Sequence, residues 1–193
     1  MSTIVVKEIS APAGQVIKVA AGKTLDLHSQ GTTKMPAGSI LQVATVMPTV
    51  GFVTLSSASW TEASSLLRVA FTPKFANSTL IIECSFMFGG NNTSNITHFK
   101  LYDITNSADI GLSTLGNRQG VHGSARQQHS DANDCDNMHI QVVTTASNTN
   151  ARTYGFFARN ESGGGAKYYF ANSGNSTALA NSKPILKITE VAG

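Results

Sequence analysis

The sequence predicts an all-β protein, and three observations carry that prediction. Charged residues make up only 13% of the chain, about half the share in an ordinary soluble domain. Gly, Ser, Thr and Asn crowd the stretches between apolar runs, and a chain short of Glu, Lys and Arg lacks the usual residues of exposed helical faces. Apolar side chains recur at alternate positions without a sustained helical period. We therefore expect an antiparallel β-sandwich of the jelly-roll type.

The first 38 residues predict a small β-rich attachment module. Residues 3 to 9 and 15 to 19 are short β-branched runs, and a turn at Ala21-Gly22 follows them. So short a segment cannot close a core of its own, so its apolar side chains should be buried against other copies or a partner surface. The candidate docking residues are Ile4, Val6, Ile9, Val16, Val19, Leu25 and Leu27.

A turn-rich connector, residues 31 to 39, leads into the main domain, and we place the boundary between residues 38 and 39. Residues 39 to 193 then predict one sandwich. Its expected strands are 40–47, 51–55, 66–72, 79–88, 96–104, 138–146, 152–159, 167–171 and 184–191. Within the fourth of these, Ile82, Cys84 and Phe86 share one face, opposite Glu83 and Ser85. Strands of this number and length match a jelly roll.

Residues 111 to 137 form a long polar segment with almost no apolar anchors. So long a loop in a compact domain is usually functional or held by a neighbour. Aromatic rings offer platforms for carbohydrate, and Asn-rich loops offer amide hydrogen bonds. The candidate ligand or partner residues are His122, Arg126 and His129 in this segment, with Trp60 and Tyr168 outside it. Core packing explains most of the aromatic residues equally well, Trp60 above all.

Metal binding is the first chemistry to test in this segment. The possible ligands are His122, His129, Asp131, Asp134, Cys135, Asp136 and His139. Their spacing matches no zinc finger, and a calcium loop requires glycine at the sixth position, where Asp136 stands. We therefore predict a solvated polar loop, with no bound metal and no cofactor.

Composition and motifs argue against several other classes. The net charge of +3 is scattered, without a cluster of Lys and Arg, which argues against nucleic-acid binding. No stretch approaches the roughly 20 apolar residues of a membrane span, and we expect neither membrane insertion nor a cleaved signal. No hydrolase motif or carboxylate pair is recognisable, so we expect no enzymatic activity. Cys84 and Cys135 are isolated and predict two free thiols.

Three stretches resemble the jelly-roll heads of tailed-phage virion proteins, as found in tail-fibre-like and capsid decoration proteins of marine and cyanobacterial phages. They are GSILQVATV at 38–46, the segment 56–90, and PILKITEV at 184–191. In that family Gly-Ser-apolar-x-Gln-Val opens the head, one strand ends in Thr-Pro, here Thr72-Pro73, and a serine, here Ser78, precedes an apolar strand. The resemblance implies a trimeric, non-catalytic β-sandwich head on a virion.

Together with the N-terminal module, the resemblance leads us to expect a homotrimeric capsid decoration, or cement, protein. It would bind the major capsid protein through residues 1 to 38 and project its head from a virion assembled in the host bacterial cytoplasm. The shortness of the segment before the head favours this function. The alternative is a short tail fibre or receptor-binding protein whose loops contact host-surface glycan.

Overall fold

The computed structural model describes residues 20–23, 35–49, 53, 57–89, 96–126, 135–161 and 183–193. The chain divides into two compact units, Met1–Lys34 and Met35–Gly193. In the first unit the described residues form a turn, closed by a hydrogen bond from the Lys23 N–H to the Ala20 carbonyl at 3.1 Å. Several predictions fall outside the described residues, namely the seven docking residues, His129, Tyr168, the strand 167–171 and all but Val53 of the strand 51–55.

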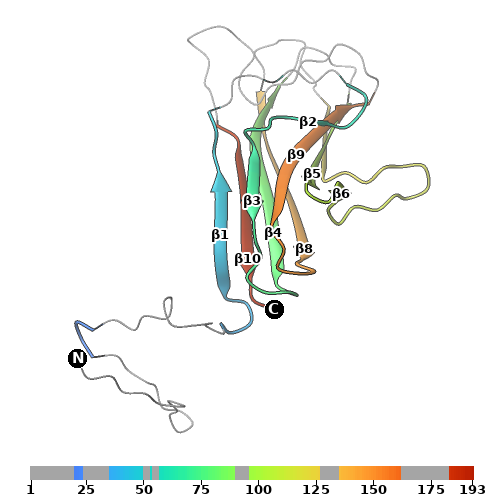
Figure 1. The fold of residues 1–193 in the computed structure, drawn as a ribbon. Coiled ribbons are helices and arrows are strands. Elements are labelled where there is room, and N and C mark those ends of the chain that lie inside the picture. Colours follow the sequence, from blue (N-terminus) through green and yellow to red (C-terminus); the bar gives the residue numbers. More distant parts are fainter. Residues whose placement is uncertain are drawn as a thin grey trace. The chain divides into compact units, whose positions relative to one another are not determined.

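The second unit consists of two antiparallel sheets (Figure 1). Sheet A has four strands in the order β1 (Ile40–Val46), β10 (Ile185–Val191), β4 (Thr79–Gly89) and β8 (Cys135–Thr145). In sheet B, β9 (Arg152–Asn160) pairs with β5 (Ile96–Asp103) along one edge and with β2 (Thr61–Glu62) and β3 (Arg68–Phe71) along the other. The free side of β5 carries β6 (Ala108–Asp109) and β7 (Gly123–Arg126).

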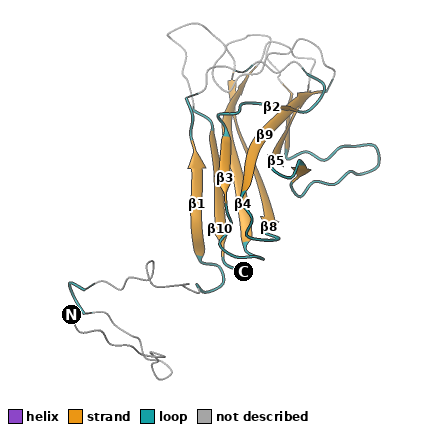
Figure 2. Cartoon of the chain, viewed as in Figure 1, coloured by secondary structure: helices purple, strands orange, loops and turns teal. Residues whose placement is uncertain are grey.

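The order of the strands is that of a jelly roll. Strands β2 and β3 share one position beside β9, and β6 and β7 share one beside β5, so the ten strands occupy eight positions. Numbered along the chain, these positions run 1-8-3-6 in sheet A and 2-7-4-5 in sheet B, the connectivity of two Greek keys. No helix occurs among the described residues (Figure 2), so this part of the chain contains no helix that could cross a membrane. The predicted fold class is confirmed, and the trimer stays a prediction.

The core lies between the two sheets and is centred on aromatic residues. Phe86 and Phe88 from sheet A contact Phe99 at ring-centroid distances of 5.0 and 5.4 Å, and Phe86 contacts Phe156 at 4.6 Å. The predicted alternation is confirmed, because Ile82 and Cys84 are fully buried in this core. Cys84 is a free thiol, and its burial strongly raises its pKa.

The predicted long loop, 111–137, is interrupted by strand structure. Strand β7 lies within it and pairs with β5, and β8 begins at Cys135 because it stays paired with β4 as far as Gly89. Alternation could not reveal β7, whose inward side bears only Gly123 and the small side chain of Ala125. The short strands β2 and β6 were also not predicted, since two residues carry no periodicity.

A fully buried carboxylate, Glu190, joins three parts of the sandwich. It accepts hydrogen bonds from Ser78 Oγ (2.6 Å), Gln42 Nε2 (2.6 Å), the Lys74 N–H (2.9 Å) and the Phe75 N–H (3.2 Å). Burial alone would raise the pKa of Glu190, but these donors outweigh it and hold the pKa below its ordinary value. We call this arrangement the Glu190 network.

Candidate functional site

Two adjoining hollows form the candidate site, and Asp109 lines both of them. The larger, which we call the polar hollow, has a volume of about 410 Å³. The smaller, which we call the tryptophan hollow, has a volume of about 230 Å³. The polar hollow lies where β5 and β8 end and β9 begins, as Asp103, Thr145 and Arg152 show.

Two polar turns build the walls of the polar hollow. After β5, Asp103 accepts hydrogen bonds from the Asn106 N–H (3.0 Å) and Asn106 Nδ2 (2.7 Å), which is the way Asx side chains stabilise turns. Between β8 and β9, Asn148 Oδ1 accepts from the Asn150 N–H at 3.0 Å. Sequences rich in Asn, Asp, Ser and Thr favour such turns over continued strands.

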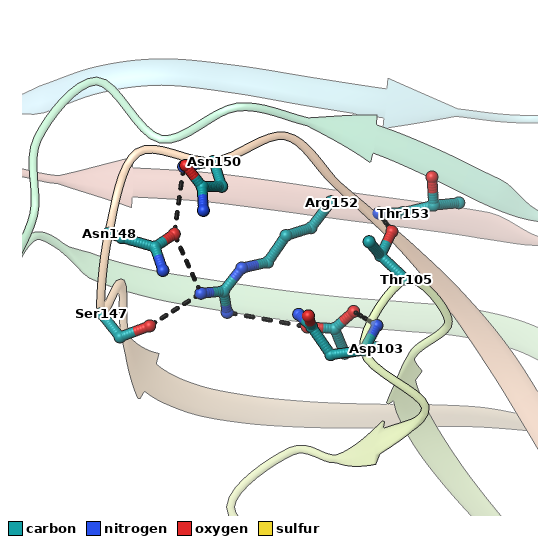
Figure 3. A network of polar contacts seen from close by, with 8 residues as sticks. Asp103, Thr105, Ser147, Asn148, Asn150, Arg152 and Thr153 are labelled. Carbon is teal, nitrogen blue, oxygen red and sulfur yellow. Dashed lines mark hydrogen bonds and ion pairs between the residues drawn. The ribbon is translucent and has the colours of Figure 1, made fainter.

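Arg152 and Asp103 form a nearly buried ion pair between these walls (Figure 3). Arg152 Nη1 lies 3.6 Å from Asp103 Oδ2, and their side chains are 16% and 6% exposed. Arg152 Nη2 donates to Ser147 Oγ (2.7 Å) and Asn148 Oδ1 (3.2 Å). Arg152 Nε is buried and has no hydrogen-bond partner within the described part of the chain. The pair compensates both charges but leaves one N–H unmatched.

The two walls are also bonded to each other. The Thr153 N–H donates to Thr105 Oγ1 at 2.8 Å, and the Ile104 N–H donates to the Thr153 carbonyl at 2.8 Å. These bonds tie the turn after β5 to the start of β9, so the polar hollow has fixed walls rather than two independent loops.

The tryptophan hollow lies on the outer face of sheet B. Lys100 is only 5% exposed there, and its Nζ lies 4.6 Å from the ring centroid of Trp60 and 4.5 Å from that of Tyr102. The same Nζ forms an ion pair with Asp109. The guanidinium of Arg159 lies 5.3 Å from the centroid of Trp60. Trp60 therefore belongs to a cation–π cluster, and it also borders the hollow.

His122 braces the segment that covers this hollow. Its Nδ1 accepts the Leu101 N–H at 2.9 Å, and its Nε2 lies 2.8 Å from the Ile110 carbonyl. A carbonyl only accepts, so Nε2 carries the proton and the ring is neutral. Burial is the main cause that holds the pKa of His122 below its ordinary value. Trp60 Nε1 donates to Gln119 Oε1 at 3.3 Å and adds a second tie to the segment.

The structure separates the residues that the sequence grouped as one candidate site. Trp60 lines the tryptophan hollow, whereas both ring nitrogens of His122 are engaged in bracing and Arg126 is an exposed residue at the end of β7. His139, a possible metal ligand, contacts Ser85 at 2.9 Å in sheet A. Within the described ranges no group of three or more His, Cys, Asp or Glu could hold a metal ion.

Sequence reasoning missed the polar residues that do converge, which are Asp103, Asn106, Asp109, Asn148 and Arg152. The available signal was a pair of polar turns, DITNSAD at 103–109 and SNTNAR at 147–152. Each reads as an ordinary strand connection on its own. Their proximity follows only from the order of β5, β8 and β9.

Comparisons with known proteins identify no family for this chain. No protein-family model matches it, and no curated protein matches it. Among solved structures, one described as infectious bursal disease virus Gx strain has a TM-score of 0.33 and 10% sequence identity. The match covers 88% of this chain and 40% of that chain, so this chain spans less than half of it. A likeness of this size carries no argument about function, and the fold assignment rests on the strand connectivity.

Proposed function

We propose that this chain is a non-enzymatic structural protein of a phage particle, whose second unit is a projecting jelly-roll head. The Glu190 network is the observation that carries the proposal. Two of its donors, Gln42 and Ser78, are positions of the phage-head resemblance, and Gln42 Nε2 also lies 2.7 Å from the carbonyl of Thr72 in the Thr-Pro motif. The residues behind the resemblance thus converge on one buried carboxylate that organises the sandwich.

Within that class, a homotrimeric capsid decoration protein is the function we favour. Its N-terminal residues 1 to 38 would dock on the major capsid protein. The edge strand β1 supports self-association, because it pairs only with β10 among the described strands and exposes Ile40 and Val43 by 62% and 53%, and Met47, just after it, is 55% exposed. Open strand edges with apolar side chains invite pairing, and neighbouring copies would cover them.

The copy number per purified virion tests this function, measured by quantitative mass spectrometry against the major capsid protein. On the order of hundreds of copies is expected for a protein that follows the capsid symmetry. A few copies would contradict decoration and place the protein on the tail or a vertex. Deletion of residues 1 to 37 should abolish attachment to particles, and a truncated chain that still binds them would contradict the docking role.

A short tail fibre or receptor-binding protein is the second candidate. The two hollows that meet at Asp109 favour it, because a purely architectural head has no need of a polar recess beside a tryptophan. Such recesses, lined by a few well-placed polar groups, are the usual form of small-ligand sites. The ligand in that case would be glycan on the host surface.

A further inference from the structure

We propose that the two hollows together bind an uncharged oligosaccharide, with one sugar unit in the polar hollow and the next in the tryptophan hollow. This inference goes beyond an architectural role and holds for a decoration protein as well as for a fibre. The size of the polar hollow, about 410 Å³, is within the range of about 300 to 1,000 Å³ typical of small-ligand sites.

The chemistry of the lining selects a hydroxyl-rich ligand. The walls of the polar hollow present carboxylates, amides and hydroxyls, contributed by Asp103, Asn106, Asp109, Thr144, Thr145, Ser147, Asn148 and Arg152. Sugar hydroxyls both donate and accept, so they match such a mixed set, whereas an apolar ligand would leave these groups unpaired.

Charge compensation selects a neutral ligand. Arg152 faces Asp103, and Lys100 faces Asp109, so each charged residue that lines the hollows already has an opposite partner. An anion would have to approach two carboxylates, and a cation would compete with Arg152 and Lys100 for the same oxygens. Both oxygens of Asp103 also accept hydrogen bonds from Asn106, which leaves little capacity for a metal ion.

Unused hydrogen-bonding groups remain for the ligand. Asn148 Oδ1 accepts hydrogen bonds from Arg152 and from the Asn150 N–H. Asn148 Nδ2 takes part in neither bond and is the donor offered to the ligand. Asp109 is half exposed and holds Lys100 through Oδ1, and its Oδ2 does not take part in that contact. Because Asp109 lines both hollows, its side chain lies where two linked sugar units would meet.

The tryptophan hollow supplies the complementary surface for a second unit. Its walls combine the polar side chains of Ser113, Thr114 and Gln119 with the apolar surfaces of Trp60 and Leu112. Sugars present C–H faces as well as hydroxyls, and a mixed lining serves both. The bonds that join Thr153 to Thr105 and Trp60 to Gln119 fix the walls before binding, which lowers the entropic cost of association.

Nuclear magnetic resonance titration of the ¹⁵N-labelled full chain tests the proposal. The probes are neutral trisaccharides of glucose, galactose, mannose and N-acetylglucosamine in α and β linkage, with sodium phosphate and calcium chloride as charged probes. We expect at least one trisaccharide to shift the amides of residues 103–120 and 144–152 saturably. Shifts by no trisaccharide, shifts confined to other residues, or saturation by phosphate or calcium alone would overturn the proposal.

Two variants connect binding to the hollows. Ala108 is exposed and lines the polar hollow, so Ala108→Phe should fill it and abolish binding, while Ala108→Ser should bind as the parent does. Thr144→Val removes one hydroxyl at constant shape and should weaken binding about tenfold, the effect of one hydrogen bond. Gln141→Ala, on the outer face of sheet A, is the matched control. Equal affinity of Thr144→Val and Gln141→Ala would overturn the assignment, even if Ala108→Phe failed to fold.

Discussion

Glu190 and Asp103 are both buried carboxylates at the ends of strands, but their surroundings differ. Glu190 is 0% exposed and accepts hydrogen bonds from four neutral groups. Asp103 is 5% exposed, faces the guanidinium of Arg152 and borders the polar hollow. The first carboxylate is enclosed by its donors, whereas the second shares its site with an unmatched Arg152 N–H and open space. Glu190, which its donors enclose, therefore has a structural role, whereas Asp103, which has open space beside it, belongs to a candidate binding site.

Glu190→Ala should produce the largest effect, because it removes the one acceptor that Ser78, Gln42 and the N–H groups of Lys74 and Phe75 share at a fully buried position. Leaving a buried group unpaired costs about 1 to 3 kcal/mol, so we expect a loss of about 4 kcal/mol or more in the free energy of unfolding, measured in urea. Glu83→Ala is the matched control, since Glu83 lies on the outer face of the same sheet and pairs with Lys187 at 2.6 Å. It should lose less than about 1 kcal/mol. Equal losses would remove the distinction between the two kinds of carboxylate.

Asp103→Asn should destabilise the fold by about 2 kcal/mol, because it leaves the Arg152 charge nearly buried and uncompensated. Arg152→Met removes that charge and fills similar space. The double variant should therefore lose clearly less than the sum of the two single losses, in a double-mutant cycle by urea unfolding. Additive losses would show that the two side chains do not act as a pair.

Gln42→Met and Asn148→Ala compare one amide from each site. Gln42 bonds Glu190 on the neighbouring strand of its own sheet and the carbonyl of Thr72 just after β3, so its replacement should cost about 1 to 2 kcal/mol. Asn148 bonds within its own exposed turn and to Arg152, and its loss should cost less than about 1 kcal/mol. Thermal unfolding of the two variants measures the difference. A larger loss for Asn148→Ala would mean that the walls of the polar hollow, and not the Glu190 network, hold this end of the fold.

Acid should destabilise the Glu190 network and the surroundings of His122 over different pH ranges. The pKa of Glu190 is lowered by folding, so its stabilisation is present above its unfolded pKa of 4.5 and is lost as the pH falls through the lower folded pKa. The pKa of His122 is also lowered from 6.5, so the unfolded chain binds a proton first and stability falls as the pH drops below 6.5. Burial lowers the pKa of His98 in the same direction.

His122→Gln should reduce the pH dependence of unfolding between about pH 7 and about pH 5. Glutamine can still accept from the Leu101 N–H and donate to the Ile110 carbonyl, but it does not titrate. The measurement is the free energy of unfolding at each pH. His98→Gln serves as the second variant and should remove the remaining slope. An unchanged slope in His122→Gln would contradict the inference that His122 is neutral in the folded protein.

Much of the sandwich could be predicted because strand geometry is local. A strand turns its side chains alternately to two faces, so the inward residues of β4, among them Ile82, Cys84 and Phe86, follow from spacing alone. Strand β7 was missed, because a Gly and an Ala on its inward side give no apolar signal. Strand β7 forms because it pairs with β5, which is remote from it in the sequence but adjacent to it in the sheet.

The candidate site was not predictable in the same way. His122, singled out as a ligand residue, braces the backbone instead, and Asp103 and Arg152 were overlooked because turns rich in Asn and Asp usually only connect strands. No local pattern distinguishes a turn that lines a hollow from one that faces solvent. The distinction needs the opposite wall.

Alternation, low charge and turn spacing were enough to predict the antiparallel sandwich and the inward residues of its long strands, since these depend on the backbone of each strand alone. Strand order decided everything that involves distant residues. Glu190 reaches Ser78 across 112 residues of sequence and Gln42 across 148, and Asp109 joins the two hollows only because β6 lies at the end of β5. Packing of the whole core offsets the entropic cost of bringing such residues together. No short stretch of sequence therefore predicts their contact.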